Sequence, residues 1–347
     1  MRLLYFGTLA WGSTSLQRFK ALCSLIKDIY GVDSRIYLDD YLFRSALKRV
    51  QIRLQWPGLI NRIGKGLLGE IKRYKPDCIW VDNGILISPH FLFNIRRDNK
   101  STLIHFTLDS LFAKGMGSVL KKSLKYYDLC FTTKPQDISY YKRIGVRNIY
   151  LLWQGYDSEL FNNVNLRQED FIKYGHDVIF IGEYTKKKLI YIKAIMNNVN
   201  CNFGLYGRGW DKIRYKKYFE KYYKGWLYGE EYVKALMTSK IALCLLNENV
   251  HDEYTTRSLE IPASGTLMIA EDTSAHRLLF KENEEAVFFK TEKELVDKIK
   301  YYLLNEEERA YISKKGKIKI QTLKLSWQDQ MSKCLDIIDR VRYEQKN

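Results

Sequence analysis

Residues 255–280, TTRSLEIPASGTLMIAEDTSAHRLLF, hold the most specific arrangement of functional groups in the chain. Their pattern predicts a short helix that carries Glu260, a stop at Pro262–Gly265, and an apolar strand over Leu267–Ala270. A carboxylate late on such a helix can accept hydrogen bonds from two adjacent ribose hydroxyls, and Gly265 would let the backbone approach a nucleotide closely. A helix, a glycine cap and a strand are also ordinary architecture, so the residues alone leave both interpretations open.

The elements around Glu260 belong to a chain that alternates short apolar runs with longer amphipathic ones, a cadence that predicts parallel sheets wrapped by helices. The cadence stops in a turn-rich stretch near 153–175 and then restarts with DVIFIGEY. In the first half, helices are expected near 15–29, 58–74, 116–126 and 136–144, between strands at Leu3–Phe6, Ser34–Tyr37, Cys78–Val81, Leu103–Phe106, Leu129–Thr132 and Asn148–Leu152.

A chain of 347 residues exceeds the length that one hydrophobic core normally serves. We therefore predict an α/β protein with two Rossmann-like domains facing across a cleft, at 1–160 and 161–325. A C-terminal helix, 326–347, is expected to cross back to the first domain. Ligands of such open parallel sheets bind beyond the carboxyl ends of the strands, which directs attention to the turns that follow each strand.

The segment RSLEIPASGTLMIAED resembles the signature of group 1 glycosyltransferases of the GT-B fold, particularly the CgeB-like (spore-maturation protein-like) branch. That branch also shows a strand ending in glycine, a YGxxW turn and a closing segment of the type LxxKIxYYLxxxxER. Here these motifs read VIFIGEY, LYGRGW and LVDKIKYYLLNEEERAYISKKG. They come in the family's order within residues 128–335, whereas the first hundred residues match only in cadence.

The resemblance implies a transferase that moves a sugar from a nucleoside-diphosphate sugar to a hydroxyl of a glycan or lipid-linked acceptor, in bacterial surface polysaccharide synthesis. By the same resemblance Glu260 would hold the donor ribose, and Asp252 or Glu253 would supply the first acidic residue of the family's pair, which contacts the donor sugar. Retention at the anomeric carbon and the absence of a metal cofactor are expected.

Basic residues near the predicted donor turns could meet the diphosphate. Arg257 lies three residues before Glu260, on nearly the same helix face, although a surface ion pair would also explain it. After the first strand of the second domain, Gly182 and either Lys186 or Lys187 could cradle phosphates; a solvated basic helix start is the alternative. At the next turn, Gly207, Arg208 and Trp210 could pack against the donor base, or Trp210 could belong to the core.

In the first domain the candidates for the acceptor side are Gly7, Gly12, His105 and Asp109. Gly7 and Gly12 lie near the end of the first strand, with no GxGxxG dinucleotide motif. Asp109 follows the strand LIHFT and could orient or deprotonate the acceptor hydroxyl, or simply cap the next segment. His105 lies within that strand and is expected to point into the sheet.

A basic and apolar segment, residues 42–77, contains eight basic side chains before Lys75 and only two acidic ones, Glu70 and Asp77. With Trp56 at its surface, this composition is typical of docking onto anionic lipid headgroups. Two amphipathic helices with solvated basic faces would give the same pattern. The basic residues are Arg44, Lys48, Arg49, Arg53, Arg62, Lys65, Lys72 and Arg73.

The net charge of +17 is concentrated in residues 1–160, where 25 Lys and Arg stand against 13 Asp and Glu. The charge alone does not show whether the partner is nucleic acid, a membrane or an acidic substrate. Because the sequence contains no recognised nucleic-acid-binding motif, no nucleic-acid partner is expected. A non-catalytic GT-B subunit remains an alternative. Six scattered cysteines and a short apolar start predict free buried thiols and a cytoplasmic protein, with a peripheral position at the inner face of the plasma membrane as an alternative.

Overall fold

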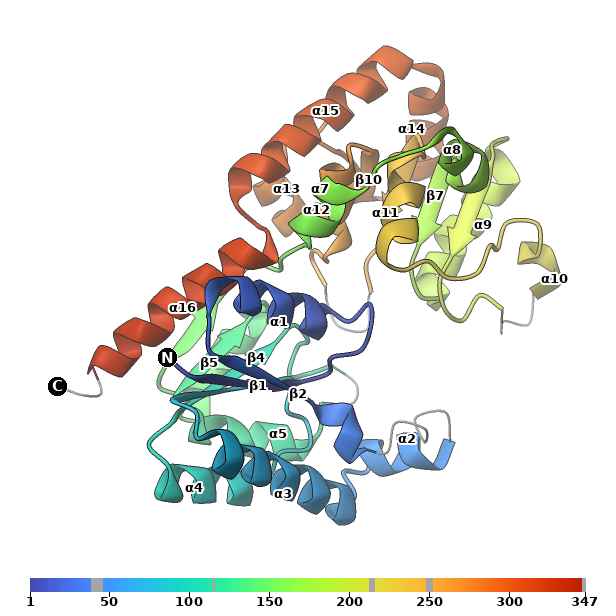
Figure 1. Ribbon diagram of the computed structural model, residues 1–347. Helices are drawn as coiled ribbons and strands as arrows, with labels where there is room; N and C mark the ends of the chain where they lie inside the picture. The colour runs from blue at the N-terminus through green and yellow to red at the C-terminus, as the bar shows by residue number, and fades with distance from the viewer. Residues whose placement is uncertain (39–45, 114–115, 212–215, 248–251, 345–347) are drawn as a thin grey trace. The chain divides into compact units, whose positions relative to one another are not determined.

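The computed structural model describes residues 1–38, 46–113, 116–211, 216–247 and 252–344, and the side chains of 46–49 and 216 lie outside this description. The chain divides into two compact units. Unit 1 comprises Met1–Gln154 and Trp327–Asn347, and unit 2 comprises Gly155–Ser326. Both are built on parallel sheets (Figure 1).

Unit 1 contains a six-stranded parallel sheet in the order β2-β1-β3-β4-β5-β6. All residues of its inner strands are buried, as the near-continuous apolar runs require when helices cover both faces. The strands are β1 (Leu3–Gly7), β2 (Ile29–Asp33), β3 (Cys78–Asp82), β4 (Thr102–Thr107), β5 (Leu129–Thr132) and β6 (Ile149–Leu151). The helices are α1 (Thr14–Leu25), α2 (Ala46–Arg53), α3 (Pro57–Tyr74), α4 (Pro89–Asp98), α5 (Ser118–Ser123), α6 (Ile138–Arg143) and α16 (Trp327–Glu344).

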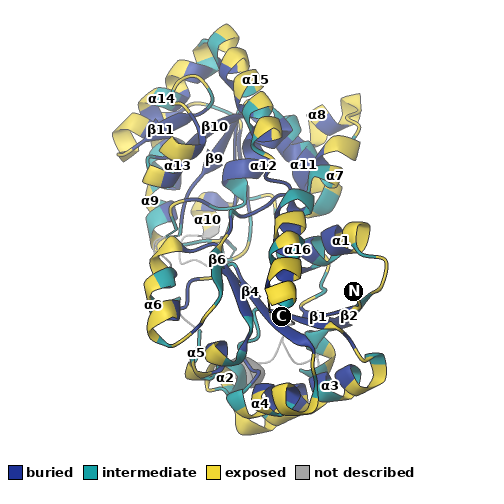
Figure 2. Ribbon diagram, turned by 90° about the vertical axis from the view of Figure 1, so that its left-hand side faces the viewer, coloured by how far each residue is buried: buried dark blue, intermediate teal, exposed yellow. Residues whose placement is uncertain are grey.

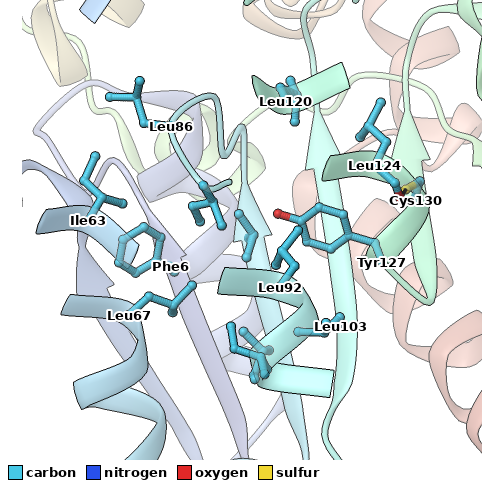
Figure 3. Packing of buried hydrophobic residues seen from close by; sticks show 14 of the residues in the cluster. Phe6, Ile63, Leu67, Leu86, Leu92, Leu103, Leu120, Leu124, Tyr127 and Cys130 are labelled. Atoms are coloured by element: carbon cyan, nitrogen blue, oxygen red, sulfur yellow. Dashed lines mark hydrogen bonds between the residues drawn. The ribbon is translucent and has the colours of Figure 1, made fainter. Parts of the chain in front are cut away.

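The two faces of this sheet hold separate cores. On one face Phe6 and Leu103 pack among side chains of α3, α4 and α5, including Leu67 and Leu92 (Figure 3). On the other face Tyr5, Trp80 and Phe106 pack with residues of α1 and α16. Helix α16 lies against α1, so the last helix belongs to the same unit as the first strand, as predicted (Figure 1).

One predicted strand in unit 1 is wrong. The strand is Ile29–Asp33, and Ser34–Tyr37 forms a 3₁₀ turn instead. The carboxylate of Asp33 accepts a hydrogen bond from the Arg35 backbone N–H and so starts the turn. Short polar side chains of this kind compete with the strand ladder for backbone donors.

Unit 2 contains a five-stranded parallel sheet in the order β11-β10-β9-β7-β8. Helices α9 and α14 pack together, and α12 packs on β9, β10 and α15. The buried strands and the half-buried helices around them are evident in Figure 2. The strands are β7 (Val178–Ile181), β8 (Phe203–Tyr206), β9 (Ile241–Cys244), β10 (Leu267–Glu271) and β11 (Val287–Phe289). The helices are α7 (Ser158–Asn163), α8 (Gln168–Tyr174), α9 (Lys186–Asn198), α10 (Lys216–Phe219), α11 (Gly229–Met237), α12 (Arg257–Ser264), α13 (Ser274–Leu279), α14 (Glu292–Leu304) and α15 (Glu306–Leu323).

Helix α12 runs through Pro262 to Ser264 and ends at Gly265, within the stop predicted at Pro262–Gly265. Gly265 has φ of 83°, the left-handed conformation that commonly closes a helix. All six cysteines are free; Cys78, Cys130, Cys244 and Cys334 are buried, but Cys23 is exposed and Cys201 half-buried.

Candidate functional site

The carboxyl ends of the five strands in unit 2 share one edge of the sheet, because all the pairings are parallel. Helix α12 returns the chain to the amino end of β10, so its first turn lies near the carboxyl edge and its last turn lies at the opposite edge. Gly265, two residues before β10, is therefore at the amino edge. This position contradicts its predicted place beside the nucleotide and gives it the role of a helix cap.

Glu260 is buried on α12, with 7% of its surface exposed. Its Oε2 accepts a hydrogen bond of 2.7 Å from the hydroxyl of Tyr232, on α11. Burial raises the pKa of the Glu260 carboxyl, and the positive charge of Arg257 and the Tyr232 hydrogen bond oppose part of that rise. Burial also raises the pKa of Tyr232 well above its usual range, so its hydroxyl stays a hydrogen-bond donor. Tyr232 was not predicted, since its contact with Glu260 is purely tertiary.

Arg257 joins the first turn of α12 to the end of β7. Its Nε donates a hydrogen bond of 2.6 Å to the carbonyl oxygen of Ile181, and its guanidinium carbon lies 5.8 Å from the centre of the Tyr232 ring. Within the described part of the chain Arg257 forms no ion pair. The surface ion pair considered for this residue is thus not what the structure shows.

The three lysines at the start of α9 have different surroundings. Lys186 is exposed, and Lys187 forms an ion pair with Glu271 at the end of β10. Lys188 is buried, and its Nζ lies 3.4 Å from the carbonyl oxygen of Glu183. Burial lowers the pKa of Lys188, and the nearby charge of Arg257 lowers it further. Among the described residues no carboxylate forms an ion pair with Lys188, so two cations, Lys188 and Arg257, lie near the 181–183 turn without a paired anion.

Gly182 and Gly207 form closely packed turns at the same edge. A Cβ atom on Gly207, whose φ is 124°, would lie 2.1 Å from the carbonyl oxygen of Gly182. That oxygen also accepts a hydrogen bond of 2.9 Å from the indole Nε1 of Trp210. Trp210 is fully buried, so it belongs to the core, and its hydrogen bond to Gly182 stabilises the turn. Arg208 is exposed and pairs with Glu183, which is also exposed.

The segment 222–228 extends the sheet beyond β8. The backbone N–H of Leu205 donates to Tyr222, and the N–H of Gly207 donates to Gly225, at 3.0 and 2.9 Å. This pairing carries Trp226 and Tyr228, each about half exposed, to the carboxyl edge beside the Gly207 turn. The flat rings are available there for stacking, and the sequence analysis did not single them out.

A buried hydrogen-bond chain holds α12 in place. His276 Nδ1 lies 2.7 Å from the carbonyl oxygen of Glu271, which can only accept, so Nδ1 carries the proton. Burial lowers the pKa of His276, which favours the neutral ring, and its Nε2 then accepts from the Ser258 hydroxyl at 2.8 Å. The Ser258 oxygen in turn accepts from the backbone N–H of Thr255 at 3.0 Å. These bonds fix the first turn of α12 and hence Arg257.

The two predicted acidic candidates, Asp252 and Glu253, lie in the segment that leads into α12. Asp252 is half-buried and Glu253 is exposed. The carbonyl oxygen of Glu253 accepts a hydrogen bond of 2.6 Å from the Thr273 hydroxyl, just after β10. This bond places the segment at the carboxyl edge, as a donor-sugar contact requires.

In unit 1, Gly7 ends β1 at the carboxyl edge, and Gly12 lies in the following loop with φ of 77°. Asp109 is exposed just after β4, where its backbone bonds to the hydroxyl of Thr107. His105 is fully buried on the face covered by α3, α4 and α5, and burial lowers its pKa to about 4. Its Nε2 lies 3.0 Å from the carbonyl oxygen of Asn83. His105 therefore belongs to the core, which corrects its predicted place on the acceptor side.

A buried ion pair that the sequence did not reveal lies beneath the Gly7 turn. Arg18 on α1 donates two hydrogen bonds of 2.8 Å to Asp82 at the end of β3, and Tyr5 donates a third at 2.7 Å. The Arg18 guanidinium lies 4.5 Å from the ring centre of Phe106 and 4.9 Å from that of Trp327. This cluster fixes α1, β3 and the start of α16 to one another inside unit 1.

Comparisons with known proteins identify the fold. Residues 188–336 match the family model described as glycosyl transferase-like, while no curated protein matches the sequence. Sucrose-phosphate synthase from Thermosynechococcus elongatus has a TM-score of 0.73 at 13% identity, over 99% of this chain and 100% of that chain. The chain has the GT-B fold.

Two other GT-B structures are similar over nearly the whole chain. A glycosyltransferase from Rickettsia africae has a TM-score of 0.69 at 12% identity, covering 98% of each chain. The Anabaena protein HepE in complex with UDP-glucose has a TM-score of 0.65 at 11% identity, over 97% of this chain and 99% of that chain.

The described residues include no cluster of three His, Cys, Asp or Glu side chains suited to a metal ion. No helix among them is long and apolar enough to cross a membrane.

Proposed function

We propose that this GT-B chain is a glycosyltransferase that binds a nucleoside-diphosphate sugar at the carboxyl edge of unit 2. The observation that carries the proposal is the grouping of Lys188, Arg257 and Glu260, which we call the donor site. Two cations without an ion-pair partner lie beside a glycine turn, and a buried carboxylate follows one helical turn later. A similar fold holds UDP-glucose in HepE, which supports this class of donor.

The donor site suits the charge that develops during transfer. The acceptor oxygen bonds to the anomeric carbon, the bond from that carbon to the diphosphate breaks, and the acceptor proton leaves to a base. Lys188 and Arg257 would stabilise the negative charge on the departing diphosphate, and fixed cations can do so without a metal ion. Retention at the anomeric carbon and a metal-independent reaction are part of the proposal, and so is membership of the CgeB-like branch.

The second carboxylate oxygen of Glu260 suits a ribose. Tyr232 occupies Oε2, which leaves Oε1 to accept from sugar hydroxyls. Asp252 and Glu253 are candidates for the donor sugar, Trp226 and Tyr228 for stacking on the base, and Asp109 of unit 1 for orienting or deprotonating the acceptor hydroxyl.

The acceptor is proposed to be a glycan or a lipid-linked sugar of a surface polysaccharide, reached from an anionic membrane surface. On α3 the residues Leu59, Ile63 and Leu67 are buried, while Arg62 and Lys65 are exposed. Trp56 beside them is 53% exposed, the pairing of aromatic and basic groups that interfacial binding uses. The side chains of Lys48 and Arg49, and the whole of Arg44, lie outside the described residues.

The deciding experiment is a thermal-shift screen with UDP, GDP, CMP, TDP and ADP, each with excess EDTA and with Mg²⁺. A ligand at about 100 times its Kd adds about 2.7 kcal/mol to the free energy of unfolding. We expect one nucleoside diphosphate to raise Tm selectively and equally in EDTA. If no nucleotide shifts Tm, the donor-site proposal fails and a non-catalytic GT-B subunit becomes the better description.

A further inference from the structure

A second candidate ligand site lies on unit 2 at the amino edge of its sheet, opposite the donor site. It is a shallow, open pocket on the surface, with a volume of about 460 Å³. Asn283 in its wall precedes β11, which places the cavity at the amino edge. The lining residues are Asn283, Asp297, Lys298, Tyr301, Tyr302 and Glu308.

The cavity presents an aromatic ring whose position is fixed. Tyr301, on α14, is 48% exposed, and its hydroxyl donates a hydrogen bond of 2.7 Å to Glu308 at the start of α15. Its ring packs edge to face on buried Tyr302, with ring centres 5.1 Å apart. The Tyr301 side chain is thus partly exposed, and its hydroxyl bond and its contact with Tyr302 limit its movement. The negative face of such a ring attracts C–H groups of a ligand.

Hydrogen-bonding groups surround the Tyr301 ring. Asp297 lies one helical turn before Tyr301 on the exposed side of α14, and its carboxylate has no hydrogen-bond or ion-pair partner among the described residues. Asn283 is exposed and is held in the left-handed conformation, with φ of 60°. Its Oδ1 accepts a hydrogen bond of 3.4 Å from the Tyr302 hydroxyl, and its side-chain NH₂ group can donate to a ligand. Lys298 is already paired, with Glu282.

The negative charge of the cavity argues against the anionic ligands that a basic protein usually binds. Asp297 and Glu308 are carboxylates, and the single lysine is neutralised by Glu282, so the cavity is acidic on a chain of net charge +17. Phosphates, nucleotides and anionic lipids would be repelled. A neutral sugar matches what is left, because it offers C–H groups on one ring face and hydroxyls, both donors and acceptors, around its rim.

We propose that this cavity is a saccharide-binding site for one unit of a neutral glycan, separate from the donor site. It goes beyond the proposed transfer reaction, since it would hold a glycan whether or not a donor is bound. A site of this kind would keep a growing polymer on the enzyme between transfers. Figure 2 colours part of α14 as exposed, and Tyr301 on this helix is 48% exposed.

The test is binding of labelled full-length protein to an array of neutral and N-acetylated oligosaccharides, followed by titration of the best ligand. We expect Tyr301→Ala to weaken binding about tenfold, the size of a lost aromatic contact, and Asp297→Ala to weaken it by a few-fold. Tyr301→Phe, which keeps the ring, should retain most of the binding. Tyr311→Ala is the matched control, because Tyr311 is 53% exposed on α15 and does not line the cavity.

Two outcomes would overturn the proposal. One is a wild-type protein that binds no oligosaccharide on the array; the other is equal loss in the Tyr301→Ala and Tyr311→Ala variants. Glu260→Ala separates this site from the donor site, since glycan binding should survive in it. Loss of glycan binding in Glu260→Ala would instead assign the saccharide to the donor site.

Discussion

Tyr232 and Glu260 form a buried hydrogen bond of 2.7 Å between α11 and α12, and neither side chain is more than 8% exposed. The bond occupies one carboxylate oxygen and leaves the other, so the pair fixes the direction in which Glu260 can bind a ligand. Arg257, one turn earlier on the same helix, is fixed by its bond to Ile181. The two side chains are thus positioned before any ligand arrives, which reduces the entropy lost on binding.

Replacing Glu260 by Ala should weaken binding of the nucleoside diphosphate found in the screen by about 1.5–3 kcal/mol, as hydrogen bonds to a charged group are lost. Titration calorimetry of the folded variant measures the change. Glu307→Ala, which removes an exposed glutamate from α15, is the control. Unchanged affinity in Glu260→Ala would remove Glu260 from the donor site.

Replacing Lys188 by Ala should weaken binding of the nucleoside diphosphate about tenfold or more, because the diphosphate loses a buried cationic partner. Binding of the matching nucleoside, which has no phosphate, should not change. Lys186→Ala is a close control, since Lys186 is exposed two residues away on the same helix. Equal effects of the two substitutions, or an equal effect on the nucleoside, would argue against phosphate binding by Lys188.

Replacing Gly207 by Ala should destabilise unit 2 by at least about 2 kcal/mol, from backbone strain at positive φ and from the clash with the Gly182 carbonyl. The midpoint of denaturant unfolding measures it. Gly69→Ala is the contrasting variant, because a Cβ atom at Gly69 on α3 meets nothing within 4 Å. That variant should be neutral or gain about 0.5–1 kcal/mol from better helix propensity. A tolerated Gly207→Ala would mean that the turn is not closely packed.

His105 should make the protein sensitive to mild acid. Its pKa in the folded state is about 4, below the ordinary value of 6.5, so the unfolded chain binds more protons between these values. Its stabilising contribution is therefore complete above pH 6.5 and is lost as the pH falls towards 4. Between pH 7.5 and pH 5 the loss is about 2 kcal/mol. His105→Gln should lose less stability than the wild type over this interval, and parallel pH profiles for the two proteins would contradict the shift.

Neutralising the basic surface of α2 and α3 should weaken binding to vesicles that contain anionic lipid. Each basic residue near such a surface contributes about 1 kcal/mol, so Arg53→Gln, Arg62→Gln and Lys65→Gln together should reduce binding more than tenfold. Vesicle sedimentation measures the effect. A control with the same charge change replaces three exposed lysines of unit 2 by Gln: Lys293, Lys300 and Lys314. If the wild type does not bind, or both triple variants lose binding equally, a specific membrane surface is ruled out.

Much of the fold could be predicted because buried parallel strands have a direct sequence signal. Runs such as CIWV and VIFI are apolar throughout, and each became a fully buried strand. The run SRIY was wrongly predicted to be a strand. The strand ends at Asp33, whose side chain accepts a hydrogen bond from the Arg35 backbone N–H and so starts a turn. Helix α4 was not predicted, although Pro89 at its first position marks its start.

The candidate site could be predicted best where a single helix carries two functional side chains. Arg257 and Glu260 are three residues apart on one helix, so their common side could be read from spacing. Lys188 was missed in favour of Lys186 and Lys187, because successive helix residues point in directions about 100° apart and spacing cannot tell which faces the sheet. The contacts of Tyr232 and Asp82 join residues far apart in the sequence. No local pattern reports such contacts.

The position of α16 has a consequence for how the protein is made. The strands of unit 1 are synthesised before unit 2, yet their sheet is covered on one face partly by Trp327, Met331 and Ile338, which are synthesised after unit 2. At about 5–20 residues per second, translation of the 172 residues of unit 2 takes about 10–35 s. During that time α1 can cover part of this face, but Phe106 lacks its contact with the Trp327 ring. The second unit consists of one uninterrupted segment, so it can complete its folding before the first unit. Chaperones are therefore expected to bind residues of the first unit during synthesis.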